Sequence, residues 1–226
     1  MARVKTTTDR EIVEAAARVI ARVGSSCLRL SDVADEIGLA PATLLQRFKT
    51  KRDLLLAVTA LRTEEIVAEF ADRRARASSP LEALLFISPE KCSIINSRQH
   101  LANSLACMQL SLTDAGFHQQ MEILARTLRS ELTSLIEEAV ETGELRGCEP
   151  DLLARAVMAI FHGSLMWWAV DRDGSAQTHI QQDLETLLAP YRTSPPAAAA
   201  NFRSPPETPV PEPEPLLVRV RAKPRP

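Results

Sequence analysis

Glycine, aromatic residues and closely spaced cysteines are scarce in this sequence of 226 residues. It contains 7 glycines, 6 phenylalanines, 2 tryptophans and 1 tyrosine, whereas 45% of all residues are hydrophobic. Sheets favour aromatic and β-branched residues, and helices favour Ala, Leu, Glu and Arg. The composition therefore favours an all-helical fold with a substantial core, in one large or two small domains.

The few cysteines and histidines show no metal-binding or disulfide pattern. Cys27, Cys92, Cys107 and Cys148 are far apart and form no CxxC motif. We expect them to be small buried residues in a reducing compartment. The four histidines, at positions 100, 118, 162 and 179, have no ligand spacing, so we expect no metal.

Membrane spans, a secretion signal and catalytic motifs are also missing from the sequence. No apolar run reaches the roughly 18 residues that span a bilayer. The first residues, MARVKTTTDREIVEAA, carry charges where a signal peptide is apolar. The sequence lacks GxSxG, a glycine-rich phosphate loop and HExxH. We therefore expect a cytoplasmic protein that is not an enzyme and needs no cofactor.

Charge divides the chain into a basic beginning and an acidic middle. Residues 1–63 contain 11 basic and 7 acidic residues, and residues 64–192 contain 11 basic and 19 acidic residues. A basic segment followed by an acidic one indicates that only the first part meets a polyanion.

Proline marks off the end of the chain. Residues 193–226 contain 10 of the 15 prolines, so we expect this tail to be disordered or polyproline-like. Its last residues alternate apolar and basic side chains. This pattern suits a docking strand, a phosphate-binding tail or a solvated terminus that has no function of its own. We expect domains at 1–51 and 52–192, with the tail at 193–226.

The basic segment reads as three short helices. Thr8 and Glu11 fit a capping box, and an apolar stripe from Ile12 to Val23 ends at Gly24. A second helix is expected over 30–37 and a third from Pro41, with Gly38-Leu39-Ala40 between them. Two short helices joined by a tight turn with glycine are typical of a helix-turn-helix, whose second helix enters the major groove. A small helical hairpin within a bundle would show the same pattern.

The acidic segment should be helical throughout. We expect one long helix over 52–77, shorter helices over 81–118 with breaks at Ser88-Pro89 and near Gly116, and periodic helices over 121–141, 150–170 and 176–190. The helix after Pro150 is apolar on more than one face, which indicates contacts with its own core and with a second chain.

Residues 9–56 resemble the N-terminal DNA-binding domain of the TetR (tetracycline repressor) family. The run LSDVADEIGLAPATLLQRFKTKRDLL carries the likeness, with these residues in step with the family: Asp32, Val33, Ala34, Gly38, Leu39, Thr43, Leu44, Phe48, Lys51, Leu54 and Leu55. The resemblance implies an all-α fold, with a three-helix helix-turn-helix domain and a C-terminal helical domain for ligand binding and dimerisation.

The resemblance also implies which residues face DNA. They are Arg29, Ser31, Pro41, Ala42, Thr43, Leu45, Gln46, Arg47 and Lys51, whereas Leu44 and Phe48 should pack inward. The chain departs from the family at Leu45, usually Tyr, and at Ala40, usually a hydroxyl-bearing helix cap. Arg29 stands at the usual cap of the preceding helix, and we expect Ser31 to cap in its place. Arg29 and Arg47 could replace the missing hydroxyls by charge, or DNA binding could be weakened.

We call residues 1–51 the head and residues 52–192 the body. For the body, the resemblance implies a homodimer and a small apolar or amphipathic effector. Gly163 and Ser164 would allow close approach of a partner helix. The candidate pocket residues are Met108, Leu112, Phe117, Met121, Phe161, His162, Met166 and Trp167, and for each of them plain core packing is an alternative.

The predicted function is a sequence-specific regulator, a repressor released from a near-palindromic double-stranded DNA operator by its effector. The alternatives are an activator of the same family, a protein-interaction module with a weakened helix-turn-helix, and a non-specific DNA-packaging protein.

Overall fold

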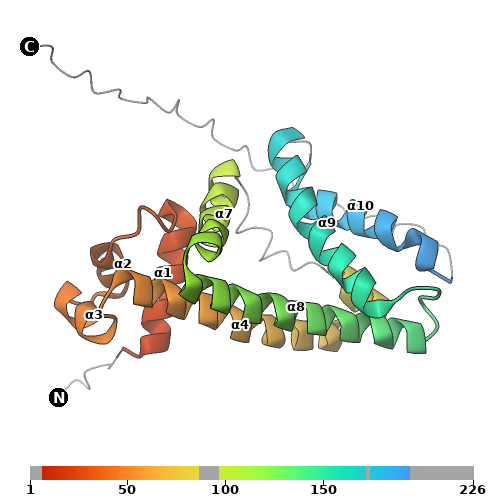
Figure 1. The fold of residues 1–226 in the computed structure, drawn as a ribbon, viewed down its shortest axis with the longest axis horizontal. Coiled ribbons are helices and arrows are strands. Elements are labelled where there is room, and N and C mark those ends of the chain that lie inside the picture. The colour runs from red at the N-terminus through yellow and green to blue at the C-terminus, as the bar shows by residue number, and fades with distance from the viewer. Residues whose placement is uncertain (1–6, 87–96, 172–173, 194–226) are drawn as a thin grey trace, which may run out of the picture. The chain divides into compact units, whose positions relative to one another are not determined.

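The fold of the described residues is entirely helical, apart from one isolated bridge between Leu145 and Arg192. The computed structural model describes residues 7–86, 97–171 and 174–193. The helices are α1 (Asp9–Val23), α2 (Leu30–Ile37), α3 (Pro41–Arg47), α4 (Lys51–Arg76), α5 (Pro80–Leu85), α7 (Arg98–Thr113), α8 (Ala115–Glu141), α9 (Pro150–Asp171) and α10 (Ala176–Leu188), followed by a 3₁₀ turn, Ala189–Tyr191 (Figure 1). The all-α prediction is confirmed for this part of the chain.

The caps that the sequence predicts for the first helices are present. The Thr8 hydroxyl accepts from the Glu11 amide at 3.2 Å, and the Glu11 carboxylate accepts from the Thr8 amide at 2.7 Å. Gly38 ends α2 with a φ of 68°, a left-handed conformation that glycine adopts without strain. Pro41 occupies the first turn of α3. These local signals therefore fix the boundaries of the helix-turn-helix.

Helix α8 starts earlier than expected. Asp114 ends α7 and caps α8, because its carboxylate accepts hydrogen bonds from the amides of Gly116 at 2.8 Å and Phe117 at 3.2 Å. The predicted break near Gly116 therefore lies at Asp114, and Gly116 itself belongs to the first turn of α8. The expected start at Met121 was wrong because the capping carboxylate was overlooked. The break predicted at Ser88-Pro89 lies outside the described residues, as does all but Thr193 of the proline-rich tail.

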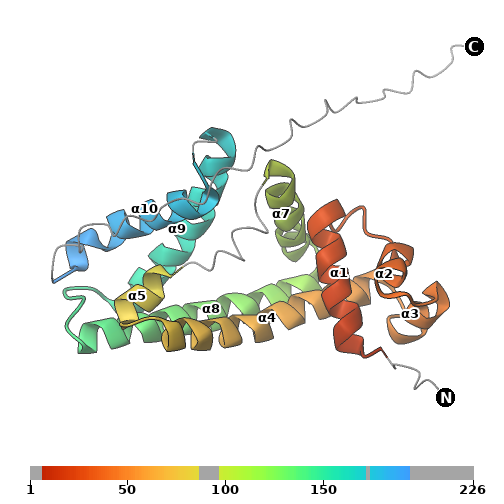
Figure 2. The same ribbon diagram turned by 180° about the vertical axis from the view of Figure 1, so that it is seen from behind.

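Two hydrophobic clusters hold the helices together. The head cluster consists of residues from α1 to α4 together with Phe117 of α8: Ile12, Val13, Ala15, Ala16, Val19, Ile20, Leu28, Val33, Ala34, Leu44, Leu54, Leu55, Leu61 and Phe117. The body cluster joins α4, α5 and α7 to α10 around the fully buried Leu135, Ile136, Ile180 and Leu188. Helices α4 and α8 lie side by side in both views and contribute to both clusters (Figures 1 and 2).

Candidate DNA-binding and effector sites

Helix α3 presents an exposed face beside a buried one. Leu44 is fully buried and Phe48 is partly buried against the head cluster, as predicted. On the other side of α3 the exposed residues are Pro41, Ala42, Leu45, Gln46 and Arg47, and Thr43 is half-buried. The packing of Leu44 thus turns the residues expected to meet DNA toward solvent.

The cations around α3 differ in their freedom to meet a phosphate. Arg29 and Lys49 are exposed. The Lys51 ammonium donates to the Ser26 carbonyl at 2.8 Å, which places it beside the loop between α1 and α2. The Arg47 guanidinium donates to the Thr7 carbonyl and lies 3.2 Å from the Asp9 carboxylate. Arg47 is therefore tied to the start of α1 in the free protein.

Ion pairs near the C-terminal end of α1 connect it to α2. The Glu36 carboxylate accepts from Arg22 at 2.6 Å and from Arg18 at 3.2 Å. The hydrogen bonds from Arg22 and Arg18 lower the pKa of Glu36 from its usual value. These ion pairs therefore join α2, which precedes α3, to α1 at the surface, where the two arginine side chains are about half exposed.

The helix caps of the motif depart from the predicted pattern at Ser31. Arg29 is the N-cap of α2, and Ser31 lies inside the first turn with its hydroxyl 3.4 Å from Asp32. The expectation that Ser31 caps α2 was therefore wrong. The Asp32 carboxylate instead accepts from the Arg29 amide at 3.2 Å. An arginine side chain has no acceptor, so the reciprocal half of a capping box cannot form here.

Helix α3 lacks a side-chain cap, as the sequence predicts from Ala40. The backbone of Ala40 has φ −69° and ψ 136°, the extended conformation of an N-cap. We expect Ala40→Ser to stabilise the protein by about 1 kcal/mol, because the hydroxyl would accept from a free amide of the first turn. Urea unfolding followed by circular dichroism measures this gain, with Ala40→Val as a control that adds bulk without an acceptor. Equal stability of the serine variant and the wild type would contradict it.

Head and body meet at two polar contacts. Asn103 of α7 is 5% exposed and donates to the carbonyls of Ala21 at 3.2 Å and Arg22 at 3.4 Å, at the end of α1. At the other contact, Arg52 of α4 donates twice to the Asp114 carboxylate, at 2.8 and 2.7 Å. Helices α7 and α8 of the body are therefore joined directly to the two helices that flank the helix-turn-helix.

Both contacts pass close to a glycine, and the backbone of Gly24 also needs one. Gly24 has a φ of 82°, and a Cβ there would lie 2.7 Å from the Asn103 side-chain oxygen. At Gly116 a Cβ would lie 2.4 Å from the Arg52 guanidinium. Sequence reasoning identified Gly24 as a helix terminator, but it did not reveal the approach of Asn103, which comes from a distant helix.

Acid should loosen the second contact. The hydrogen bond from Arg52, assisted by the amides of Phe117 and Gly116, holds the pKa of Asp114 well below its usual range. A carboxyl group with a lowered pKa stabilises the folded state above its unfolded pKa, about 4, and this contribution is lost as the pH falls toward the folded value. We expect Asp114→Asn to lower the Tm at pH 7 and to flatten the decline of Tm between about pH 5 and pH 2.

Asparagine retains an oxygen that can cap α8, so Asp114→Ala should lower the Tm further. Thermal melts of the three proteins across this pH range measure both effects. A decline of Tm in Asp114→Asn as steep as in the wild type would show that the contact adds nothing to acid sensitivity.

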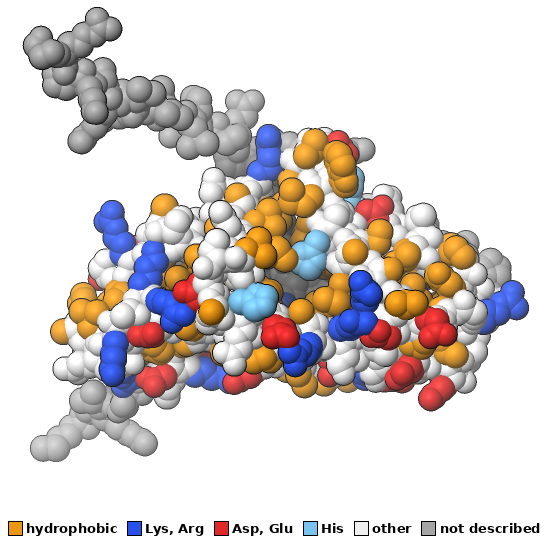
Figure 3. All heavy atoms as spheres, viewed as in Figure 1, with side chains coloured by type: hydrophobic (Ala, Val, Ile, Leu, Met, Phe, Trp, Pro, Cys, Tyr) orange, Lys and Arg blue, Asp and Glu red, His pale blue; other side chains and the backbone are white. Residues whose placement is uncertain are grey.

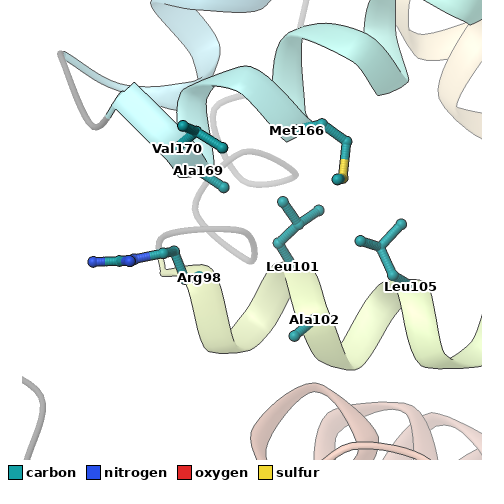
Figure 4. A pocket seen from close by; sticks show the side chains of 7 residues that line it. All are labelled: Arg98, Leu101, Ala102, Leu105, Met166, Ala169 and Val170. Carbon is teal, nitrogen blue, oxygen red and sulfur yellow. The ribbon is translucent and has the colours of Figure 1, made fainter.

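A groove in the body lies between α7 and α9. We call it the α7–α9 groove; its volume is about 390 Å³, and it is lined by Arg98, Leu101, Ala102, Leu105, Met166, Ala169 and Val170 (Figure 4). Met166 is the one residue that this lining shares with the predicted pocket set. The other lining residues were missed because the pocket depends on how α7 crosses α9, which has no signature in either helix alone.

The remaining predicted pocket residues do not line this groove. Phe117 is 6% exposed and belongs to the head cluster, and Leu112 is 81% exposed. The Phe161 ring packs against the body cluster, and Met108, Met121 and Trp167 do not line the groove. His162 is exposed and lies 2.9 Å from the Met158 carbonyl of its own helix.

The outward side of α9 is apolar and uncovered. We call Leu152, Ala156, Ala159, Gly163, Trp167 and Val170 the outer α9 face; they recur at steps of three and four residues, and Leu152, Trp167 and Val170 are 57%, 65% and 65% exposed. A Cβ at Gly163 would meet open space, whereas Ser164 is buried and donates to Asp183 of α10. Hydrophobic side chains gather over this part of α9 in Figure 3.

Helix α9 is long and apolar enough to cross a membrane by length and composition, the one such helix among the described residues. Its 18-residue window has a mean hydropathy of 1.3, and 28% of the window is buried. This is weak evidence for a span, because α9 also packs against α8 and α10. The low burial leaves an apolar surface of α9 exposed in the single chain.

Cys27 and Cys148 are free thiols. Cys27 is exposed, which corrects the expectation that all four are buried. Cys148 is partly buried, and burial raises the pKa of its thiol. In the described ranges no group of histidine, cysteine and carboxylate side chains could hold a metal ion.

Both parts of the chain match known protein families. The family model described as bacterial regulatory proteins, tetR family, matches residues 12–58. The model described as BetI-type transcriptional repressor, C-terminal, matches residues 94–191. The fatty acid metabolism regulator protein of Bacillus subtilis is 19% identical over 162 residues, which cover 71% of this chain and 83% of that protein.

Solved structures share the fold at low identity. A TetR transcription regulator from Haloarcula marismortui has a TM-score of 0.67 at 18% identity, covering 81% of this chain and 97% of that one. The regulator FadR from Bacillus subtilis, solved with stearoyl-CoA, has a TM-score of 0.64 at 19% identity, covering 80% and 98%. A transcriptional regulator from Saccharomonospora viridis, solved with choline, has a TM-score of 0.65 at 20% identity, covering 80% and 95%.

The family models match the helix-turn-helix and the helical body in the order in which the structure places them. The chain belongs to the TetR family of bacterial transcriptional regulators.

Proposed function

We propose that the chain is a homodimeric repressor that binds a near-palindromic operator and releases it when a small molecule binds in the body. The observation that carries this proposal is the exposed face of α3, held outward by the burial of Leu44 within a TetR-type helix-turn-helix. The match of the body to a transcriptional repressor supports repression rather than activation.

Helix α3 is the proposed reading element. Thr43 and Gln46 offer hydrogen-bonding groups to base edges, and the exposed Leu45 offers an apolar surface that suits a thymine methyl group. Arg29, Lys49 and Lys51 surround α3 with positive charge for the phosphates, while Arg47 must leave Asp9 or share its guanidinium to take part. Ser31 and the exposed N-terminal residues of α3 complete the proposed contact surface.

The outer α9 face is the proposed dimer interface. It is apolar and exposed in one chain, and its small central residues Ala156, Ala159 and Gly163 allow two copies of α9 to approach closely. A two-fold axis through this face would give the dimer two copies of α3, which can read two half-sites one helical turn of DNA apart, about 34–36 Å.

We propose that the effector binds between α7 and α9. The groove volume of about 390 Å³ lies within the usual range for small-molecule sites. The contact of Asn103 with α1 then gives α7 a direct route to the DNA-binding helices. The proposed domain boundary is the start of α4 at Lys51, which leaves residues 52–192 as the effector and dimerisation domain, and the proposed location is the cytoplasm.

The test is DNA binding by fluorescence anisotropy at about 150 mM salt, with the DNA upstream of the gene and a shuffled control of equal length. The proposal predicts affinity for the genuine sequence about 10³-fold above that for the control. Equal, tight binding to both would favour DNA packaging. Absence of binding to both would favour a protein-interaction module whose helix-turn-helix is weakened at Ala40 and Leu45.

A further inference from the structure

The α7–α9 groove is apolar along its length and charged at one end. Leu101 and Leu105 of α7 face Met166, Ala169 and Val170 of α9 across it, and Ala102 lies at its edge with its side chain directed away from α9 (Figure 4). These side chains offer no hydrogen-bond donor and only the weakly accepting sulfur of Met166, so a polar group seated between them gains no strong replacement for the bonds to water that it loses. The groove therefore favours hydrocarbon as the part of a ligand that lies in it.

Arg98 supplies the charge at the mouth of the groove. It is the first residue of α7, it is exposed, and its guanidinium lies at the open edge of the gap, directed outward (Figure 4). The described residues provide no carboxylate within ion-pair distance of it. The positive end of the α7 dipole adds to this charge. A ligand group that emerges beside Arg98 is therefore favoured when it is an anion.

The lining also argues against a cationic ligand. Proteins bind quaternary ammonium groups on the faces of aromatic rings, and the lining contains neither an aromatic residue nor a carboxylate. The positive charge of Arg98 would repel such a group. The choline seen in the related Saccharomonospora viridis structure therefore does not fit the chemistry of this groove.

We propose that the effector is an anionic amphiphile, with an unbranched aliphatic chain between α7 and α9 and a carboxylate or phosphate-bearing head beside Arg98. This inference rests on the proposed function, in which the groove is the effector site. A free fatty acid and an acyl thioester of coenzyme A share this chemistry, and the experiment distinguishes them.

Two tryptophans lie next to the site on α9. Trp167 and Trp168 are the only tryptophans in the sequence. They follow Met166 and precede Ala169 in the sequence without lining the groove themselves, so a ligand that shifts α9 should change their fluorescence. We would titrate the full-length protein with dodecanoate, dodecanoyl-coenzyme A, dodecyltrimethylammonium and choline, each below the concentration at which it self-associates. We expect saturable binding of one or both anions, with the tighter of the two identifying the head group, and binding of the cations at least about tenfold weaker.

Variants locate the site. Arg98→Glu reverses an exposed charge, so it should weaken binding of the preferred anion by about three- to tenfold. The same variant should reduce the difference in affinity between this anion and the cationic amphiphile. Ala169→Phe should weaken every chain-bearing ligand by filling the groove, because the Ala169 side chain points into it (Figure 4). Arg126→Glu, an equal charge change on the exposed surface of α8, should leave binding unchanged. Equal binding of dodecanoate and dodecyltrimethylammonium, or no effect of both Arg98→Glu and Ala169→Phe, would overturn the inference.

The same titrations on protein bound to labelled operator separate this inference from the proposed function. If the anion binds in the groove but the operator stays bound, the ligand class stands and release by the effector fails. If the operator is bound specifically but neither anion changes the tryptophan fluorescence, the repressor stands and the ligand class fails.

Discussion

Replacing Ala159 by glutamate is expected to convert the dimer to a monomer and to weaken operator binding by about 10²-fold or more. Ala159 is exposed near the middle of the outer α9 face, where two copies of α9 are proposed to meet. In a two-fold interface each substitution appears twice, so two carboxylates would enter an apolar contact, with only Arg155 and His162 of the same helix at i−4 and i+3. A monomer then binds one half-site and loses the gain from two linked contacts. Sedimentation velocity and operator anisotropy measure the two effects.

Ala71→Glu is the matched control, because it makes the same chemical change at an exposed position of α4. It should leave both the mass in solution and the affinity for the operator unchanged. A dimeric Ala159→Glu protein with full affinity would show that the outer α9 face is covered by something else, and a monomeric one with full affinity would show that dimerisation is not needed for DNA binding.

Replacing Phe117 by alanine is expected to lower the free energy of unfolding by about 3–5 kcal/mol. Phe117 projects from the first turn of α8 into the head cluster and is 6% exposed. The guanidinium of Arg52 lies 5.8 Å from its ring centroid. Removing the ring would leave a cavity where α8 meets the head. Urea unfolding followed by circular dichroism measures the loss, and Phe117→Leu should lose less because it leaves a smaller cavity.

Leu112→Ala provides the contrast to Phe117→Ala. Leu112 is 81% exposed, so its truncation should change stability by at most about 0.5 kcal/mol. Both residues were predicted from sequence to line an effector pocket, and in that case both variants would change effector affinity with similar effects on stability. A small loss of stability in Phe117→Ala together with weakened effector binding would contradict the core role of Phe117 and would indicate that it lines the effector pocket.

The sequence predicted the head more closely than the body because its signals are local. The capping box at Thr8, the glycine at 38 and the proline at 41 each determine backbone geometry within a few residues. The burial of Leu44 follows from the helical period once those boundaries are set. The missing cap at Ala40 was also visible, because it depends on one side chain.

The lining of the α7–α9 groove could not be predicted in the same way. Arg98, Leu101 and Leu105 lie on α7, which has no strongly one-sided apolar pattern, and they meet Met166 of α9 only through the packing of the two helices. Phe117 shows the same limit, because its hydrophobic character indicates burial but does not say in which cluster. The contacts of Asn103 with α1 and of Arg52 with Asp114 likewise join residues that are distant in sequence.

The sharing of α4 between the two clusters has a consequence for folding cooperativity. Leu54 and Leu61 of this helix belong to the head cluster, whereas Ile66 and Phe70 belong to the body cluster. The head cannot lose its core while α4 stays intact in the body without exposing Leu54 and Leu61 to water. We therefore expect one unfolding transition instead of two. Release of DNA would then be a movement of folded helices, and the recognition helix would keep its amide protection against hydrogen exchange throughout.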